Sequence, residues 1–249
     1  MTLKVENLVG GYGKIPVLKD ISFEVKQGQL VGLIGLNGAG KSTTINHIIG
    51  LLRPYKGQIT LDGVSLQTNP QEYKKKIAYI PETPILYEEL TLKEHLELTM
   101  MAYDLDSKKA WNKANALLKT FRLANKLEWF PANFSKGMKQ KVIIFCSFLT
   151  EASLFIIDEP FLGLDPLATR DLLDLIATEK RRGAAVLMST HVLSTAQEVC
   201  DCFVLIDQGQ IKATGTLAQL QENYGQGQNA LADIYLTMTQ EGQHDGVME

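Results

Sequence analysis

Short runs of apolar residues recur along the chain and are separated by longer stretches compatible with helices. The runs are Leu30–Ile34, Ile77–Ile80, Leu154–Ile157, Ala185–Met188 and Phe203–Ile206. This alternation is typical of an α/β domain with a mostly parallel sheet. Ahead of the first run, apolar and polar residues alternate between Val17 and Val25, as in a half-exposed antiparallel strand. We therefore predict an α/β core with a small antiparallel β layer at its N-terminus.

Residues 84–152 show a different pattern. In LTLKEHLELTMMAY and KANALLKTFRLANKLEWF, apolar residues recur every three or four positions, and no strand-like run intervenes. This spacing predicts an inserted helical subdomain over 84–152, with residues 1–83 and 153–225 forming the core. Residues 226–249 are polar apart from the short apolar segment ALADIYLTM, so we expect a short helix followed by a frayed tail.

Composition and charge exclude several classes of protein. The 249 residues are 45% hydrophobic and 21% charged, enough for one substantial domain that carries a smaller subdomain. The net charge of -3 and the absence of a dense Lys/Arg tract disfavour a nucleic-acid partner. No apolar run approaches the roughly 20 residues of a membrane-spanning helix. The first residues lack the pattern of a signal peptide, so we expect a cytosolic chain.

The three cysteines, Cys146, Cys200 and Cys202, are too few for a disulfide framework. The Cys200-x-Cys202 pair has no second pair or nearby histidine that would complete a zinc site. We expect reduced thiols without a metal.

The segment GLNGAGKST carries the strongest chemical signal. Gly35, Gly40, Lys41 and Ser42 match G-x-x-x-x-G-K-[ST] directly after an apolar run and before a helix-like segment. Glycines allow successive N–H groups to surround a phosphate at the positive end of the helix. Lys41 would neutralise β/γ-phosphate oxygens, and Ser42 would offer its hydroxyl to Mg²⁺. The predicted nucleotide-binding residues here are Gly35, Asn37, Gly38, Ala39, Gly40, Lys41, Ser42 and Thr43.

A glycine-rich turn that merely links strand to helix is the alternative, and the complete motif in this context disfavours it. The loop alone does not separate a kinase, a GTPase and an ATPase. Asp158 and Glu159 follow another apolar run, where two adjacent carboxylates are costly without a cation. Asp158 can hold Mg²⁺, and Glu159 can polarise the water that attacks the γ-phosphate. Solvated acids in a strand-end turn are the alternative.

The phosphate loop, the IIDEP segment and the elements between them resemble, in this order, the ATP-binding subunits of ABC transporters. The resemblance covers nearly the whole chain. FSKGMKQK, residues 134–141, resembles the signature motif of that family: Ser135 and Gly137 match, whereas Lys136 and Met138 depart from the commonest form. Ser135 is a good N-cap for a helix whose exposed N–H groups attract an anion. The resemblance implies that this helix binds the phosphate held by a second copy, so the site is composite and the protein a homodimer.

Further site residues are implied by the same resemblance. Tyr12, in GGYGK, matches the aromatic residue that stacks on adenine, although a lone tyrosine also serves in packing. Asp165, in LGLDP, matches a loop that communicates across the dimer. His191, in MSTH, matches the histidine that contacts the γ-phosphate and positions water. Lys41, Glu159 and His191 are thus the predicted catalytic residues.

One position departs from the family pattern. YIPE places Glu82 where the family often has Gln, at a residue that reaches Mg²⁺ and water and senses the membrane partner. An ionised Glu can still coordinate Mg²⁺ through oxygen but cannot donate a hydrogen bond. The predicted metal ligands are therefore Ser42, Glu82 and Asp158. The charge of Glu82 could instead pair with a basic residue of the partner.

The signature motif, PETPILYEELTLKEHLEL and FLGLDPL are most similar to the Ecs-type ATP-binding subunits of bacterial exporters. This resemblance implies an ATPase that uses ATP and Mg²⁺, closes as a homodimer and drives a separate multi-span subunit through the surface around 82–92. It would lie on the cytoplasmic side of the membrane. A soluble ABC-type ATPase acting on DNA or ribosomes is the alternative, but those usually carry a coiled-coil insertion or tandem modules. A regulatory module without turnover is disfavoured by Glu159 and His191.

Overall fold

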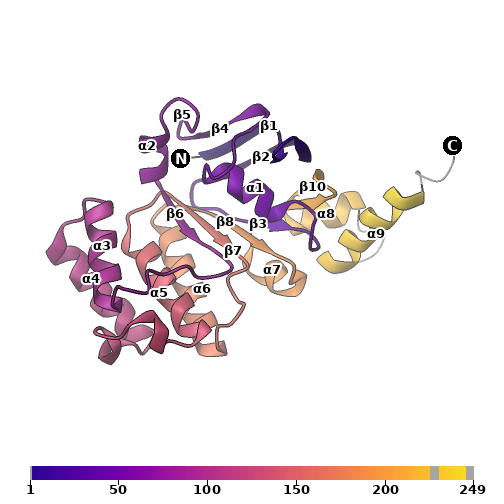
Figure 1. The fold of residues 1–249 in the computed structure, drawn as a ribbon. Helices are drawn as coiled ribbons and strands as arrows, with labels where there is room; N and C mark the ends of the chain where they lie inside the picture. The colour runs from indigo at the N-terminus through magenta and orange to yellow at the C-terminus, as the bar shows by residue number, and fades with distance from the viewer. Residues whose placement is uncertain (1, 225–229, 245–249) are drawn as a thin grey trace.

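The computed structural model describes residues 2–224 and 230–244 and is built around a six-stranded sheet (Figure 1). Its order is β10-β9-β3-β8-β7-β6, and only β10 runs antiparallel to its neighbour. The strands are β3 (Leu30–Ile34), β6 (Ile77–Ile80), β7 (Leu154–Asp158), β8 (Ala185–Thr190), β9 (Cys202–Asp207) and β10 (Gln210–Gly215). All five predicted runs are strands. Every residue of β3, β7 and β8 is buried, because both faces of the sheet are covered.

A second, antiparallel sheet confirms the predicted N-terminal β layer. It has the order β2-β1-β4-β5, with β1 (Thr2–Tyr12), β2 (Ile15–Lys26), β4 (Lys56–Leu61) and β5 (Val64–Ser65). Leu18, Ile21 and Val25 of β2 point inward. Helix α1 (Lys41–Ile48) contributes to the same hydrophobic cluster, which lies between the two sheets. A short helix, α2 (Pro70–Lys75), follows β5. This layer therefore holds α1, the helix that follows the phosphate loop, against the parallel sheet.

The predicted inserted helices lie between β6 and β7. They are α3 (Leu92–Ala102), α4 (Ser107–Thr120) and α5 (Lys136–Leu149), with 3₁₀ turns at Ala124–Lys126 and Pro131–Asn133. Thr91 begins α3 through a capping box with Glu94. Phe148 of α5 stacks on Phe155 of β7 with ring centroids 4.8 Å apart. One hydrophobic cluster thus joins the helical subdomain to the core, and the boundaries at 84 and 152 stay predictions.

The remaining helices are α6 (Pro166–Arg181), α7 (Leu193–Val199), α8 (Leu217–Tyr224) and α9 (Leu231–His244). Helix α9 packs against α7 and α8 at one end of the molecule (Figure 1). It lies where the sequence predicts a short final helix, whereas the predicted tail, 245–249, and the Gly/Gln-rich segment 225–229 lie outside the described residues. Among the helices in the described ranges, none is long and apolar enough to cross a membrane.

All three cysteines are free thiols. Burial raises the pKa of Cys146 to about 11 and that of Cys200 to about 12. These thiols are therefore protonated and poorly nucleophilic at neutral pH.

Candidate functional site

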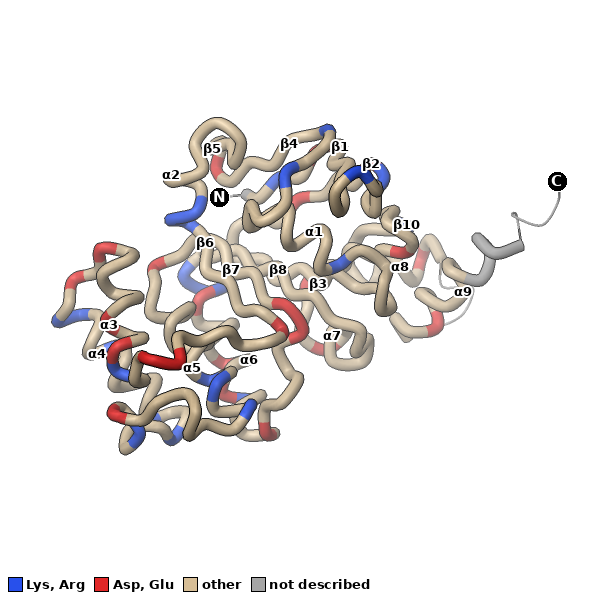
Figure 2. Tube along the Cα trace, viewed as in Figure 1, with Lys and Arg blue, Asp and Glu red and all other residues tan. Residues whose placement is uncertain are grey.

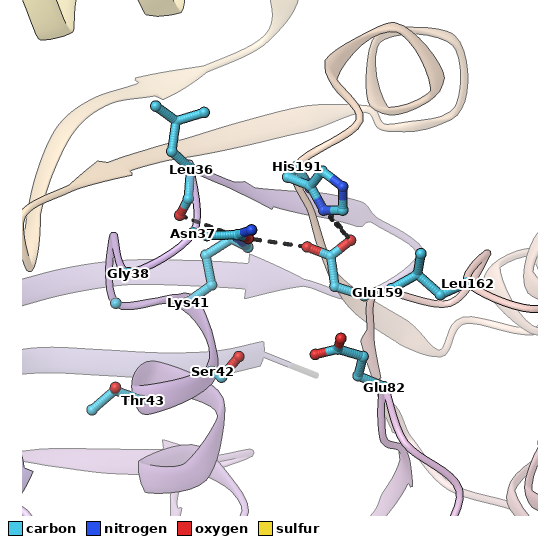
Figure 3. Close-up of a pocket in the computed structure, with 11 residues that line it drawn as sticks. Leu36, Asn37, Gly38, Lys41, Ser42, Thr43, Glu82, Glu159, Leu162 and His191 are labelled. Carbon is cyan, nitrogen blue, oxygen red and sulfur yellow. Dashed lines mark hydrogen bonds and ion pairs between the residues drawn. The ribbon is translucent and has the colours of Figure 1, made fainter.

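A cavity of about 280 Å³ opens beside the carboxyl ends of β3, β7 and β8, at the beginning of α1 (Figure 3). This is the edge of a parallel sheet where ligands of open α/β folds bind. The residues that line the cavity are Leu36, Asn37, Gly38, Gly40, Lys41, Ser42, Thr43, Glu82, Glu159, Leu162 and His191. Six of them belong to the predicted phosphate-binding set, and the predicted residues Glu82, Glu159 and His191 join these six from elements far apart in sequence.

The loop from β3 to α1 is shaped to bind an anion. Gly38 and Gly40 have φ of 83° and 114°, which side chains with a Cβ rarely adopt. Gly40 is the N-cap of α1 and supplies no side-chain hydrogen bond to it. The first N–H groups of the helix therefore lack a side-chain acceptor, and they face the cavity at the positive end of the helix dipole. A phosphate group fits this need.

Lys41, Glu159 and His191 meet inside the cavity (Figure 3). Lys41 Nζ lies 3.5 Å from Glu159 Oε1 and donates to the carbonyl oxygen of Gly35 at 2.8 Å. On the other side, His191 Nδ1 lies 2.9 Å from Glu159 Oε2. Glu159 Oε1 has no hydrogen-bond partner among the described residues. The nearly buried carboxylate of Glu159 thus lies between a lysine and a histidine, with Oε1 beside the lysine and Oε2 beside the histidine.

The backbone aims Glu159 and Asp158 in different directions. Glu159 has a left-handed φ of 47°, a conformation that costs on the order of 1 kcal/mol or more for a residue with a Cβ and is concentrated at functional sites. Its N–H donates to Ser189 Oγ at 3.2 Å. The Ser189 hydroxyl in turn donates to Asp158 Oδ1. Burial raises the pKa of Asp158, while the hydrogen bond from Ser189 opposes this shift.

The predicted metal ligands lie around one side of the cavity. Ser42 and Glu82 face each other across it (Figure 3), and Asp158 is buried nearby. Burial raises the pKa of Asp158, and a hydrogen bond with the Ser42 hydroxyl partly offsets this rise. Within the described part of the chain, no three His, Cys, Asp or Glu side chains gather to hold a metal by themselves. A Mg²⁺ ion would therefore depend on phosphate oxygens and water for its other ligands, which is its usual preference.

Four predicted site residues, Tyr12, Ser135, Gly137 and Asp165, lie apart from both this cavity and the loop from β3 to α1. Tyr12 ends β1 and is 51% exposed. Ser135 caps α5, where its Oγ accepts from the N–H of Met138 at 3.3 Å. Gly137 and Asp165 lie near this cap, and these four positions are therefore surface features of the single chain.

Gly137 and Asp165 link the start of α5 to the segment after Glu159. An added Cβ at Gly137 would lie 2.5 Å from the carbonyl oxygen of Gly163, so only glycine fits. Asp165 caps α6 by accepting from the N–H of Ala168 at 2.8 Å, and it accepts from Lys141 Nζ at 3.0 Å. These hydrogen bonds hold the pKa of Asp165 below its usual value.

Gly35 and Ala39, the remaining predicted residues, support the loop from outside the cavity. An added Cβ at Gly35 would lie 2.5 Å from the carbonyl oxygen of Ile206. Ala39 is buried, and its carbonyl oxygen accepts from the N–H of Gly209 at 2.9 Å.

Three residues of the site were not predicted. Leu36 and Leu162 line the cavity, and Ser189 holds Asp158 and the backbone of Glu159. Ser189 could have been recognised from the sequence, because a hydroxyl near the end of an apolar strand needs a hydrogen-bond partner when it is buried. Leu36 lies inside the phosphate-loop motif, whereas nothing in the sequence distinguishes Leu162 from a packing leucine.

Comparisons with known proteins point to one family. The sequence model of the ABC transporter family matches residues 18–162. The ABC-type transporter ATP-binding protein EcsA of Bacillus subtilis (strain 168) is 56% identical over 96% of this chain and 97% of its own length. A solved ATP-binding subunit of an ABC transporter superposes with a TM-score of 0.93 at 51% identity, covering 96% of this chain and 100% of the other.

A dimeric ATP-binding cassette bound to ADP and Pi in a post-hydrolysis state shares the fold at 23% identity, with a TM-score of 0.77 and coverage of 86% of this chain and 98% of that chain. The fold, the phosphate loop and these similarities agree with a transporter subunit and give no support to an ATPase that acts on nucleic acid. The chain belongs to the ABC transporter family, as an ATP-binding and ATP-hydrolysing subunit.

Proposed function

We propose that this chain powers an exporter-type ABC transporter: two copies close on two Mg-ATP molecules and drive a separate transmembrane subunit from the cytoplasmic side. The observation that carries the proposal is the arrangement of Lys41, Glu159 and His191 at the uncapped start of α1. It combines a helix end suited to phosphate with a buried carboxylate that lies between a lysine and a histidine. That combination suits the transfer of a phosphoryl group to water.

In this mechanism each residue has a distinct task. The N–H groups of 38–43 and Lys41 bind the β- and γ-phosphates. Ser42, Asp158 and Glu82 would hold Mg²⁺, which would offset phosphate charge. Glu159 Oε1 accepts a proton from the attacking water. At the same time the water oxygen bonds to the γ-phosphorus, and the bond between that phosphorus and the leaving oxygen of ADP breaks. His191 holds the other carboxylate oxygen and orients the water. Tyr12, exposed at the end of β1, stacks on adenine.

The composite site follows from the positions of Ser135 and Gly137. Both lie outside the cavity of their own chain, and α5 begins at this exposed cap, where the positive end of its dipole favours an anion. A second copy that presents this helix end to the γ-phosphate would complete the site. The dimeric cassette of the same fold supports such an assembly.

Mixing two inactive variants tests the composite site. A Lys41→Ala chain and a Ser135→Arg chain are each expected to lack turnover as homodimers. In a mixed dimer both lesions fall on one site, so the other site is intact and activity should exceed the mean of the parents. Mass spectrometry of the mixture verifies that mixed dimers form. If they form without regaining activity, each site belongs to one chain only.

The segment after β6 is suited to contact a membrane partner. Ile85 and Tyr87 are 82% and 62% exposed, and exposed apolar residues favour an interface. The segment is also attached to α5: Gln140 Nε2 donates to the carbonyl oxygen of Pro81 at 3.1 Å, and Lys139 Nζ lies 3.1 Å from Glu88 Oε1. A movement of the helix that bears the signature motif is therefore transmitted to 82–92.

Lys and Arg are dispersed among acidic residues along the described trace rather than gathered in one basic stripe (Figure 2).

Affinity purification from membranes in mild detergent tests this function. The wild-type chain should recover a multi-span protein in stoichiometric amount. Ile85→Asp should lose it, because a charge would enter the apolar contact. Met101→Asp is the matched control, since Met101 is 72% exposed at the end of α3, outside 82–92. Recovery of ribosomes or nucleic acid instead would favour the alternative function.

A further inference from the structure

The side chain of Tyr235 joins the C-terminal helix to the phosphate loop. Tyr235 lies on α9, 199 positions from Leu36 in sequence, yet its hydroxyl accepts a hydrogen bond from the N–H of Leu36 at 3.1 Å. The same hydroxyl donates to the carbonyl oxygen of Ile206 at 3.2 Å. The side chain is 1% exposed, and burial raises its pKa. The hydroxyl is therefore protonated and bridges β9 to the first turn of the loop.

This bridge lies at the peptide units that hold Lys41. Ile206 is packed so closely on Gly35 that its carbonyl oxygen would be 2.5 Å from an added Cβ there. Lys41 Nζ donates to the carbonyl oxygen of Gly35 at 2.8 Å and to that of Leu36 at 3.4 Å. The position of these two residues thus sets both the path of the loop and the resting place of its lysine.

Helix α9 is fixed firmly enough to serve as the anchor. Leu231, Ile234 and Tyr235 are buried in one cluster with Ile34, the last residue of β3. The N–H of Leu231 also donates to Gln197 Oε1 at 2.7 Å. Since Gly35 directly follows Ile34, α9 packs against the strand from which the phosphate loop starts.

We propose that Tyr235 is a positioning residue for ATP: its hydroxyl fixes the first turn of the phosphate loop in the conformation that receives phosphate, so that α9 contributes to ATP affinity. A loop held in its binding conformation loses less conformational entropy when the ligand binds. Tyr235 touches no phosphate itself. The inference rests on the proposed role of residues 35–43 in phosphate binding.

Tyr235→Phe tests the proposal, because it removes the hydroxyl and keeps the ring. We expect the Kd and KM for ATP to rise about 3- to 10-fold, the effect of losing one such hydrogen bond, with kcat within about twofold of wild type. Tyr103→Phe is the matched control: Tyr103 also donates to a strand carbonyl oxygen, that of Ile77, at 3.0 Å, but far from the loop. It should leave the KM for ATP unchanged.

Hydrogen exchange in the nucleotide-free protein provides the local readout. Peptides covering 34–40 should exchange faster in Tyr235→Phe and not in Tyr103→Phe. An unchanged KM, or a fall in kcat alone, would overturn the proposal even if the melting temperature falls. If Tyr235→Phe has no effect while Lys41→Ala abolishes ATP binding, only the role of Tyr235 fails. If Lys41→Ala also binds ATP normally, the phosphate-loop assignment fails.

Discussion

Glu159→Gln is expected to reduce ATP turnover by about 10²- to 10⁴-fold, the usual contribution of a general base, while ATP still binds. Glutamine keeps the shape of the side chain but cannot accept the proton of the attacking water. In the structure Glu159 Oε1 lies 3.5 Å from Lys41 Nζ and has no hydrogen-bond partner among the described residues, whereas Oε2 lies 2.9 Å from His191 Nδ1. The substitution therefore removes the reacting group with little change of packing.

The variant should also accumulate as a closed dimer, because ATP is held and not hydrolysed. Size-exclusion chromatography with ATP and Mg²⁺ should show a stronger dimer peak than wild type, alongside phosphate-release assays of turnover. Glu151→Gln, at an exposed glutamate before β7, makes the same chemical change outside the cavity and should keep wild-type turnover. A Glu159→Gln chain that hydrolyses ATP normally and stays monomeric would refute the assignment.

Lys41→Ala is expected to weaken ATP binding by at least about 10-fold. A hydrogen bond to a charged group contributes about 1.5–3 kcal/mol, and 1.4 kcal/mol is tenfold in affinity. Lys41 is nearly buried and lies 3.5 Å from Glu159, so its charge acts in a site with little water to screen it. Titration calorimetry with ATP gives the affinity directly.

Two controls separate this effect from a loss of structure. Lys108→Ala removes an exposed lysine on α4 and should leave ATP affinity unchanged. The circular dichroism spectrum of Lys41→Ala should match that of wild type, although its melting temperature can fall because Glu159 loses its ion partner. An ATP affinity within a factor of two of wild type would mean that residues 35–43 do not hold the phosphates.

The fold could be predicted largely because its strands are short, wholly buried runs. In β3, Leu30–Ile34, every residue is buried, and a strand buried on both faces has a continuous apolar sequence that can be recognised directly. The antiparallel layer was recognisable from the alternation in β2, whereas β1, β4 and β5 were not predicted individually. The partners of those strands depend on contacts between distant segments, which local periodicity does not record.

The residues of the site also differ in how well the sequence predicts them. Lys41 and Glu159 lie in compact motifs whose spacing reflects their chemistry, and the structure brings them within 3.5 Å. Tyr235 lies in a segment without a motif, and its role depends on a contact across 199 positions. Ser135 shows a third limit, since a single chain holds this capped helix end apart from its own cavity, and the cavity that the helix would complete belongs to a second copy.

The close contact between Gly137 and Gly163 affects how the sequence can drift during evolution. A side chain at 137 would press on the carbonyl oxygen of Gly163, and Gly163 itself has φ of 85°, so any other residue at either position would strain the backbone. A descendant that had lost ATP hydrolysis would keep both glycines for this steric reason. Ser135, an exposed cap that other residues replace at a cost of about 1 kcal/mol, is under no such constraint. If Ser135 binds phosphate as proposed, its loss would record the end of that binding in a lineage, whereas the glycines would persist.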